Sequence, residues 1–424
     1  MLRLLGVTGS ALVISISGAH AGSFGLNEYG ATGTGMALAG GAAGGAGLAS
    51  IVFNPATLTD FAGMWSSQTF TFVGPSVGVN SSVYGDTGDM ANGGRLVPAA
   101  QMTYQFNDKL WFGLTIDSPF GLVTNIYPYS YESFFGLWTT VLDIDATPTI
   151  SYKVNEWLSV GAGVQVNYFK AELSNNLTPL VPGSFFLLNG HDISPGYKLG
   201  ATVKPFAGTE IGVGYRSQLK PNISGTLLNT IPLPGLSGLI PAGQQHMNLG
   251  LILPDQINVG IRQVITDDVT LMATYQWTNW SVFNRFIVNS DAGPALPLNF
   301  YYKDGWLMSI GGEYKFNSNT TLRAGTGFER SPINDLNRTV RLPDTDRIFL
   351  SVGGSYQFTP QLTVDAAYEH VFGRNEPVNM TNSANPEFNG IPFVGETKPD
   401  VNIFSLTLNY RWDAPPAAAV VAKY

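Results

Sequence analysis

The segment Gly22–Gly63 reads GSFGLNEYGATGTGMALAGGAAGGAGLASIVFNPATLTDFAG. It is dominated by Gly and Ala, and its charged residues are Glu28 and Asp60 alone. The segment lacks the period-two alternation of a strand, and its Gly content disfavours a free helix because each Gly costs about 1 kcal/mol relative to Ala. Small residues allow close backbone approach, and their backbone polar groups then need partners from outside the segment. We therefore expect a small plug that the rest of the chain surrounds.

The rest of the chain alternates between strand-like segments and turns. Near its end, the apolar residues Phe404, Leu406 and Leu408 alternate with the polar residues Ser405 and Thr407, which is typical of a strand between lipid and a wet lumen. About fourteen strands are predicted, at residues 64–79, 95–106, 109–118, 142–153, 157–173, 194–205, 209–223, 247–264, 268–288, 304–316, 320–330, 346–358, 361–373 and 400–412. The predicted fold is all-β: a 14-stranded antiparallel transmembrane β-barrel with a small N-terminal plug, or hatch, inside the lumen. Short turns are expected on the periplasmic side and long loops outside.

Composition and the first residues point to export. The 424-residue chain has 12% charged residues, a net charge of −8 and no cysteine, which argues against nucleic acid as a partner and suits an exported protein. Residues 1–21 resemble a secretory signal with basic Arg3, the apolar run Leu4–Ile16 and cleavage after Ala21. No apolar run reaches the length of a membrane helix. The expected domains are 1–21 signal peptide, 22–63 hatch, 64–412 barrel and 413–424 Pro/Ala-rich tail, in the bacterial outer membrane.

A soluble β-sandwich would show the same alternation, but with its polar faces outside an apolar core. In a barrel whose apolar faces meet lipid, many charges instead face the lumen, where water and ion pairing make them tolerable; a dry interior would make them costly. The charged residues predicted to face inward include Asp145, Lys198, Lys204, Glu210, Arg216, Arg262, Glu313, Arg323, Glu329, Asp365, Glu369 and Arg411. This set favours a plugged, hydrated barrel.

Several stretches carry a resemblance to a known family. The segment GLNEYGATGTGMALAGGAA, followed by Asn54-Pro55-Ala56, resembles the N-terminal hatch of the FadL-type outer-membrane transporters. Downstream, Asp117–Thr124 (DSPFGLVT), Leu253–Gly260 (LPDQINVG), Tyr275–Phe283 (YQWTNWSVF) and Glu329–Gly353 resemble the same family in the same order. This family carries long-chain fatty acids and, in some branches, aromatic hydrocarbons. The resemblance covers nearly the whole chain.

The resemblance, together with backbone chemistry, selects three elements for ligand binding and gating. The start of the hatch, Phe24-Gly25-Leu26, is implied to run into the lumen and contact the ligand pocket. The triplet Asn54-Pro55-Ala56 suits a structural turn where the hatch ends, because Pro restricts the residue before it and Asn bonds locally to the backbone. Pro119-Phe120-Gly121 is expected to kink or end the third strand, since Pro cannot donate to a ladder. In the family such a kink makes a lateral opening.

The substrate is left open between a fatty acid and a neutral hydrocarbon. The apolar stretches Leu177–Gly190 and Leu227–Gly243 are expected to be outer loops that collect ligand or pack as a lid. A fatty acid carboxylate needs a cation. The resemblance suggests Lys170 and Lys303, although strand parity points Lys170 outward.

Signals for other chemistry are weak. The match Gly74–Gly78 to G-x-S-x-G, with Ser76 at its centre, lacks the following helix that an esterase elbow requires. The histidines show no ligand spacing, so neither a catalytic residue, a metal site nor a cofactor is expected. The favoured function is passive outer-membrane transport of hydrophobic small molecules by a monomer in contact with outer-membrane lipid. Two alternatives remain: an adhesion or binding barrel, and an outer-membrane lipid hydrolase.

Overall fold

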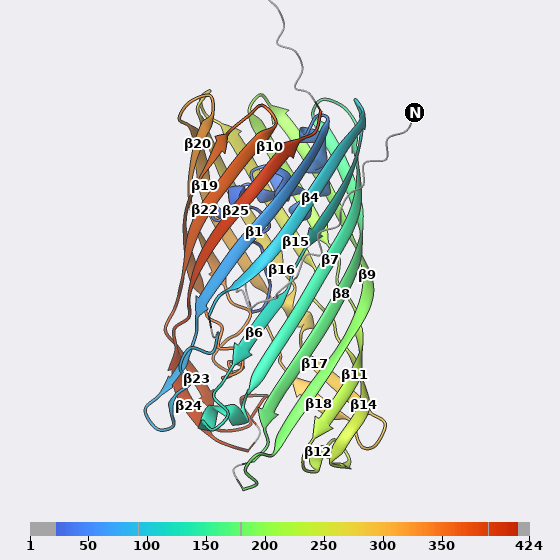
Figure 1. Ribbon diagram of the computed structural model, residues 1–424, viewed down its shortest axis with the longest axis vertical. Coiled ribbons are helices and arrows are strands. Elements are labelled where there is room, and N and C mark those ends of the chain that lie inside the picture. The colour runs from blue at the N-terminus through green and yellow to red at the C-terminus, as the bar shows by residue number, and fades with distance from the viewer. Residues whose placement is uncertain (1–22, 92, 179, 389, 414–424) are drawn as a thin grey trace, which may run out of the picture.

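The protein is a closed antiparallel β-barrel around its own N-terminal segment (Figure 1). The structure, a computed structural model, describes residues 23–91, 93–178, 180–388 and 390–413. The predicted signal peptide and almost all of the predicted tail lie outside these residues. Strand β1 pairs with β4 on one side and with β25 on the other, which closes the sheet. No helix in the described part of the chain is long and apolar enough to cross a membrane.

The barrel has fourteen strand positions, as the sequence predicted, and five of them are built from two consecutive segments. The undivided strands are β1 (Met64–Ser76), β4 (Arg95–Asn107), β7 (Trp138–Lys153), β8 (Leu158–Asn176), β9 (Phe185–Phe206), β20 (Thr320–Arg330), β21 (Arg347–Gln357), β22 (Leu362–Gly373) and β25 (Asp400–Arg411). The divided ones are β5 (Leu110–Asp117) with β6 (Gly121–Asn125), β10 (Thr209–Arg216) with β11 (Asn222–Asn229), β14 (Gly243–Gly250) with β15 (Gln256–Val264), β16 (Val269–Thr278) with β17 (Arg285–Ser290), and β18 (Leu296–Asn299) with β19 (Gly305–Lys315).

The interruptions correct three predicted strands. The ranges 209–223, 247–264 and 268–288 were predicted as continuous, and each is broken in the structure. Leu219 and Leu253 occupy two of the breaks and turn into the interior, where they are 1% and 0% exposed. The third break holds a 3₁₀ turn, Trp280–Val282. In each case burial of an apolar side chain in the lumen replaces a regular ladder.

The apolar stretches predicted as outer loops are partly strand. Within Leu177–Gly190, β9 begins at Phe185, and Leu227–Gly243 contains the end of β11 and the hairpin β12 (Leu233–Gly235) with β13 (Gly238–Ile240). Some of their apolar side chains, such as Leu188 and Leu227, are buried in the interior, while others, such as Leu180, remain exposed.

The two ends of the barrel differ. At the turn end, uppermost in Figure 1, exposed aromatic residues lie beside the short turns, as expected of an interfacial girdle. They are Tyr104, Phe106, Tyr314, Phe316, Tyr356, Phe358, Tyr410 and Trp412. At the loop end, β2 (Val79–Ser81), β3 (Gly85–Asp86), β23 (Glu376–Met380) and β24 (Phe393–Thr397) form a separate small sheet. The 3₁₀ turn Tyr131–Phe134 lies in another long loop.

Residues 23–63, called the hatch from here on, lie inside the barrel and are almost entirely buried (Figure 1). The hatch holds two single-turn helices, α1 (Ala31–Thr34) and α2 (Ser50–Phe53), and 3₁₀ turns at Gly41–Ala43, Gly47–Ala49 and Pro55–Asp60. Its backbone rests against glycines of the wall: a Cβ atom at Gly212 would overlap the carbonyl oxygen of Ala42, and one at Gly214 would overlap that of Phe53. The absence of side chains at these wall positions therefore makes room for the hatch.

Candidate functional site

The third strand position is interrupted where the sequence predicted a kink. Strand β5 ends at Asp117, and β6 resumes the pairing with β7 at Gly121. On the other side, β4 pairs with β5 only from Ala100 onward, so its residues 96–99 pair with β1 alone among the described strands. No hydrogen-bonded ladder therefore joins residues 96–99 of β4 to β6.

The tip of the hatch occupies the inside of this interruption. Gly25 forms an isolated antiparallel bridge with Phe120. The Leu26 N–H donates to the Pro119 carbonyl at 2.9 Å, and the Gly121 N–H donates to the Phe24 carbonyl at 2.9 Å. The structure thus brings together the six residues that the sequence proposed for the hatch start and the kink.

The Phe24 side chain lies at the centre of an aromatic cluster. Its ring centroid lies 5.7 Å from that of Phe120, 4.9 Å from Trp280 and 5.3 Å from Phe283. The side chain is 4% exposed. The guanidinium of Arg216 lies 5.1 Å from the centroid of the Phe120 ring, in a cation–π arrangement. The hatch tip, the kink and the break between β16 and β17 at Trp280 therefore share one packed cluster.

Polar contacts hold the tip on both sides of Phe24. The Ser23 N–H donates to Asp344 at 2.8 Å. The side-chain amides of Asn27 and Gln276 exchange two hydrogen bonds, each of 3.1 Å. The tip is thus fixed to the loop before β21 and to β16.

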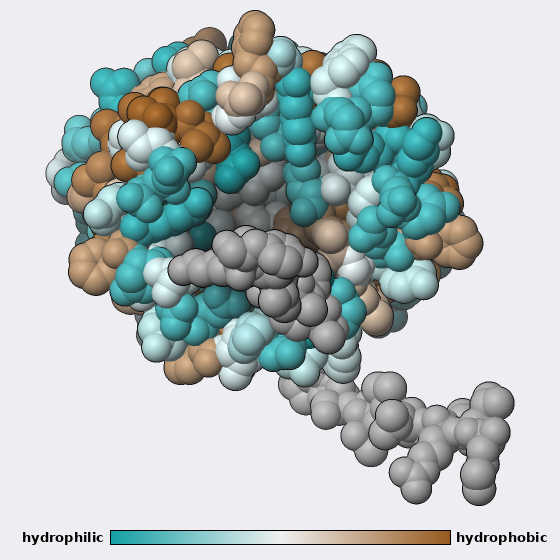
Figure 2. Space-filling model, turned by 90° about the horizontal axis from the view of Figure 1, so that it is seen from above, coloured by the Kyte–Doolittle hydropathy of each residue, from teal (hydrophilic) through white to brown (hydrophobic). Residues whose placement is uncertain are grey.

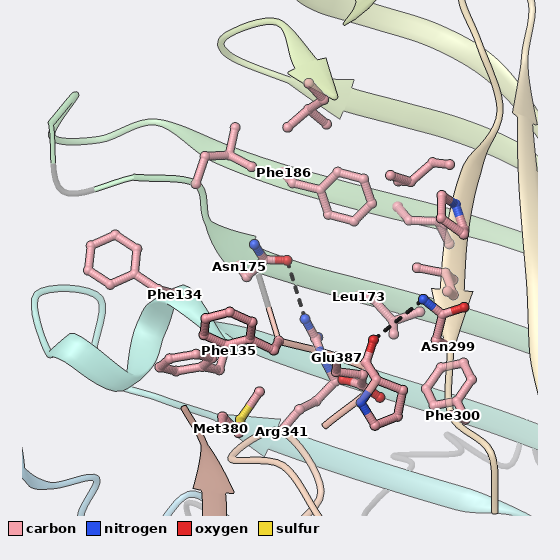
Figure 3. Close-up of a pocket in the computed structure, with 18 residues that line it drawn as sticks. Phe134, Phe135, Leu173, Asn175, Phe186, Asn299, Phe300, Arg341, Met380 and Glu387 are labelled. Atoms are coloured by element: carbon pink, nitrogen blue, oxygen red, sulfur yellow. Dashed lines mark hydrogen bonds between the residues drawn. The ribbon is translucent and has the colours of Figure 1, made fainter. Parts of the chain in front are cut away.

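An inner pocket of ≈ 60 Å³ lies next to Phe24 and is lined mostly by apolar side chains from β7, β8 and the strand breaks. Its wall residues include Leu122, Val141, Phe169, Ala171, Leu251, Phe283 and Tyr302. An outer groove of ≈ 290 Å³ lies nearer the loop end, close to the lower limit of about 300 Å³ for ligand pockets. Figure 3 shows this groove between Phe134 and Phe135 on one side and Asn299 and Phe300 on the other.

The inner pocket and the outer groove share five residues: Leu173, Leu298, Phe300, Arg341 and Glu387. Arg341 is held by its neighbours, donating to the Thr139 hydroxyl at 2.9 Å and to the Asn175 side-chain oxygen at 3.3 Å (Figure 3). Among the described residues, no carboxylate forms a direct ion pair with it. Burial raises the pKa of the Glu387 carboxyl to about 7, and the charge of Arg341 opposes this rise. The boundary between the two spaces thus offers one cation and one carboxyl that titrates near neutrality.

Other predicted site residues lie elsewhere. Asn54 caps the 3₁₀ turn that follows it, accepting from the Ala56 N–H at 3.0 Å, and its amide donates to the Ala42 carbonyl at 2.7 Å. It also donates to a carbonyl of β9, so the triplet Asn54-Pro55-Ala56 fixes the hatch to the wall and does not line either ligand space. Lys170 pairs with Glu172 at 2.9 Å on the outer face, and Lys303 is exposed. Neither lysine lines the groove or the pocket.

Arg341 and Glu387 were missed from the sequence because both lie in irregular loops, where no periodicity indicates the direction of a side chain. Arg341 falls within the stretch Glu329–Gly353 that resembles the family, which was the available signal. In the described part of the chain, no three His, Cys, Asp or Glu side chains form a metal site. Ser76 is exposed at the end of β1 and pairs with Asp400 in the sheet, a strand setting unlike an esterase elbow.

Comparisons with known proteins agree with this architecture. Residues 12–412 match the family model described as outer membrane protein transport protein (OMPP1/FadL/TodX). The 47 kDa outer membrane protein of Pasteurella multocida is 27% identical over 426 residues, which cover 95% of this chain and 97% of that protein. The long-chain fatty acid transport protein of Escherichia coli (strain K12) is 24% identical, with 96% and 98% covered.

Two solved structures share the fold. A Pseudomonas aeruginosa FadL homologue superposes with a TM-score of 0.81 at 24% identity, covering 93% of this chain and 100% of its own. The Ralstonia pickettii toluene transporter TbuX superposes with a TM-score of 0.69 at 20% identity, covering 91% and 98%.

Proposed function

Since this chain belongs to the OMPP1/FadL/TodX family of outer membrane transport proteins, we propose that it is a passive transporter of hydrophobic monocarboxylates such as long-chain fatty acids. The family relatives are named for fatty acid transport and the structural neighbours for toluene transport. Both names describe largely apolar small molecules. The proposal extends that chemistry to the groove, pocket and kink of this chain.

The proposed route has three steps. The outer groove collects the ligand at the loop end, and the ligand tail enters the inner pocket against Phe24. Displacement of the hatch tip then exposes the interruption at Pro119–Gly121. The ligand leaves sideways into lipid there, so its apolar tail never has to cross water.

One observation carries this proposal: Phe24 lines the inner pocket while its own backbone bonds to the kink. A ligand that pushes Phe24 aside must pull on the Gly121 N–H, which donates to the Phe24 carbonyl. Filling the pocket and opening the wall are therefore mechanically coupled.

Arg341 supports a carboxylate as the head group, because its guanidinium lies between groove and pocket without a direct ion-pair partner among the described residues. A neutral aromatic hydrocarbon is the second candidate. The aromatic lining around Phe283 and Tyr302 favours it, since offset and edge-on ring contacts stabilise such ligands.

The test is to straighten the kink. The double variant Pro119→Thr/Gly121→Val restores a backbone donor and places β-branched residues where a regular strand is wanted. Uptake of a long-chain fatty acid by cells should drop sharply, while ligand binding at the outer groove persists. Val123→Thr on β6 is the matched control and should transport normally.

Normal uptake by a correctly folded double variant would refute lateral release. Absence of lipophile binding by the native protein would instead favour the adhesion barrel, and labelling of Ser76 by a serine-directed probe would favour the lipid hydrolase.

A further inference from the structure

The outer face of the barrel wall carries an apolar groove of ≈ 560 Å³ across β15, β16, β19, β20 and β21, called the wall groove from here on. Two rows of side chains paired across the strands line it: Tyr275, Met308 and Phe328 in one row, and Ala273, Ile310 and Thr326 in the next. Met308 and Ile310 are 50% and 63% exposed and point outward. The wall groove shares no residue with the inner pocket or the outer groove, so it is a separate space.

The wall groove lies within the part of the wall that faces lipid. Phe316, in the aromatic girdle at the turn end, follows Trp306 of β19 by ten residues. At ~3.3 Å per residue and a strand tilt of ~40°, this separation spans ~25 Å along the barrel axis, the usual height of the apolar band. Trp306 and its cross-strand partner Trp277 therefore mark the other membrane interface, and the wall groove lies between the two interfaces. Seen from the turn end, hydrophobic side chains show at the outer margin of the barrel and hydrophilic ones surround the central hollow (Figure 2).

Three exposed cations lie on the loop-end side of this interface, in or beside the strand breaks. Lys220 lies between β10 and β11, Arg285 is the first residue of β17, and Lys303 lies between β18 and β19. The neighbouring Phe286 and Tyr302 are buried in the interior, so the cations next to them lie on the outer side of the wall. Among the residues that the structure describes, none of the three cations has an ion-pair partner.

The two carboxylates in the same group of strand breaks are held by local donors. Asp304 accepts from the Trp277 indole at 3.3 Å and from the Ser281 N–H at 3.1 Å. Asp255, between β14 and β15, is 9% exposed and accepts from the Asn279 side-chain amide at 2.8 Å. Three cations and two carboxylates leave this part of the wall with a charge of +1, on a chain whose net charge is −8. It therefore attracts an anionic group from outside the chain.

We propose that the wall groove and the cations on its loop-end side bind a phosphorylated lipid of the outer leaflet, with an acyl chain in the wall groove and phosphate groups at Arg285 and Lys303. Guanidinium and ammonium groups bind phosphate through charge-assisted hydrogen bonds, and each cation near a membrane surface strengthens the binding of anionic lipid. The wall groove is continuous with the surface that already faces lipid, so an acyl chain reaches it without displacing protein. The inference goes beyond the proposed transport function and does not depend on it.

Native mass spectrometry of the purified protein in detergent, titrated with lipid A and with dephosphorylated lipid A, tests the head-group contact. Arg285→Gln/Lys303→Gln should weaken the binding of lipid A about 10- to 30-fold, because two cations at the membrane surface are lost. Binding of the dephosphorylated lipid should not change. Lys109→Gln is the matched control: Lys109 is an exposed cation in the turn between β4 and β5, at the opposite end of the barrel, and its loss should leave both affinities unchanged.

Ala273→Phe tests the wall groove, because the larger side chain would fill the hollow beside Ile310. This variant should weaken the binding of lipid A and of dephosphorylated lipid A by the same factor, since both lipids carry the acyl chains. Ala366→Phe, at an exposed position of β22 outside the wall groove, is the matched control and should bind both lipids as the native protein does. Heat-modifiable gel mobility checks that each barrel is folded.

Any of four results would overturn the inference. Equal binding of the two lipids by the native protein would exclude recognition of phosphate. Native affinity of the folded Arg285→Gln/Lys303→Gln variant for lipid A would place the head group elsewhere, and native affinity of folded Ala273→Phe would do the same for the acyl chain. A dimer of the native protein that is absent from Ala273→Phe would identify the wall groove as a contact between two copies of this chain.

Discussion

Binding of a fatty acid is expected to weaken as the pH rises through neutrality, because of Glu387. Its carboxyl has a pKa of about 7, so it is mostly neutral at pH 6 and mostly charged at pH 8. An ordinary carboxylic acid ligand ionises near pH 4 to 5 and is charged across this range. Only above pH 7 does a ligand carboxylate held by Arg341 meet a second negative charge at the same boundary. The fatty acid should therefore bind more tightly at pH 6 than at pH 8.

The magnitude follows from Coulomb's law. Two like charges about 8 Å apart repel by ~1–2 kcal/mol at an effective dielectric constant of 20–40. That free energy corresponds to a Kd that rises about 5- to 30-fold between pH 6 and pH 8. The effect should vanish in Glu387→Gln, whose affinity should match that of the native protein at pH 6.

Equilibrium binding of a long-chain fatty acid to the purified protein in detergent, measured by calorimetry at both pH values, checks this. Glu396→Gln is the matched control: Glu396 is an exposed loop-end carboxylate outside the groove, and the variant should keep the native pH dependence. A neutral aromatic ligand should bind equally at both pH values. A pH dependence that survives in Glu387→Gln, or that the neutral ligand shares, would refute the role of Glu387.

Deletion of Ser23–Asn27 should lower binding of lipophilic ligands while heat-modifiable mobility stays native, since the tip adds no strand to the closed sheet; loss of folding would contradict a gating role. Gly212→Ala should displace the hatch and make cells sensitive to large antibiotics, because the new Cβ would overlap the hatch backbone. Gly250→Ala is the control, since Gly250 has open space around it. Equal antibiotic sensitivity of the two variants would contradict the role assigned to the glycine at position 212. Asn54→Ala should destabilise the hatch by about 1–3 kcal/mol, because the Ala42 carbonyl loses its donor, and limited proteolysis should then cut the hatch faster than in the native protein.

The strand pattern was readable from the sequence because period-two alternation is a local property. The breaks at Leu219 and Leu253 were missed although each contains a proline, Pro221 and Pro254, that cannot donate to a ladder. What the sequence did not show is that the two leucines turn inward, because that depends on the apolar partners that the lumen offers. Pro119 marked the third-strand kink because a missing backbone donor is visible in the sequence itself.

The residues considered for ligand binding show the same difference between local signals and contacts that are distant in sequence. Lys170 lies between the buried residues Phe169 and Ala171 of β8, on the opposite face of the strand, as strand parity predicts. Arg341 belongs to a loop, and its direction depends on contacts with Thr139 and Asn175, which are distant in sequence. Such a residue is found only when the fold brings those partners together.

If the hatch tip gates the wall as proposed, its hydrogen bonds to the kink also set how often the empty barrel is open. Moving the tip away leaves the Gly121 N–H and the Pro119 carbonyl facing hydrocarbon, where no water replaces their partners. Under the proposed gating, at about 2 kcal/mol for each group, the loss of these two partners alone would limit the open gap to about one unliganded molecule in a thousand. Conductance through the wall should therefore be a property of the ligand-bound population. A cell that makes much of this protein would gain uptake capacity for its substrate without a matching rise in general permeability.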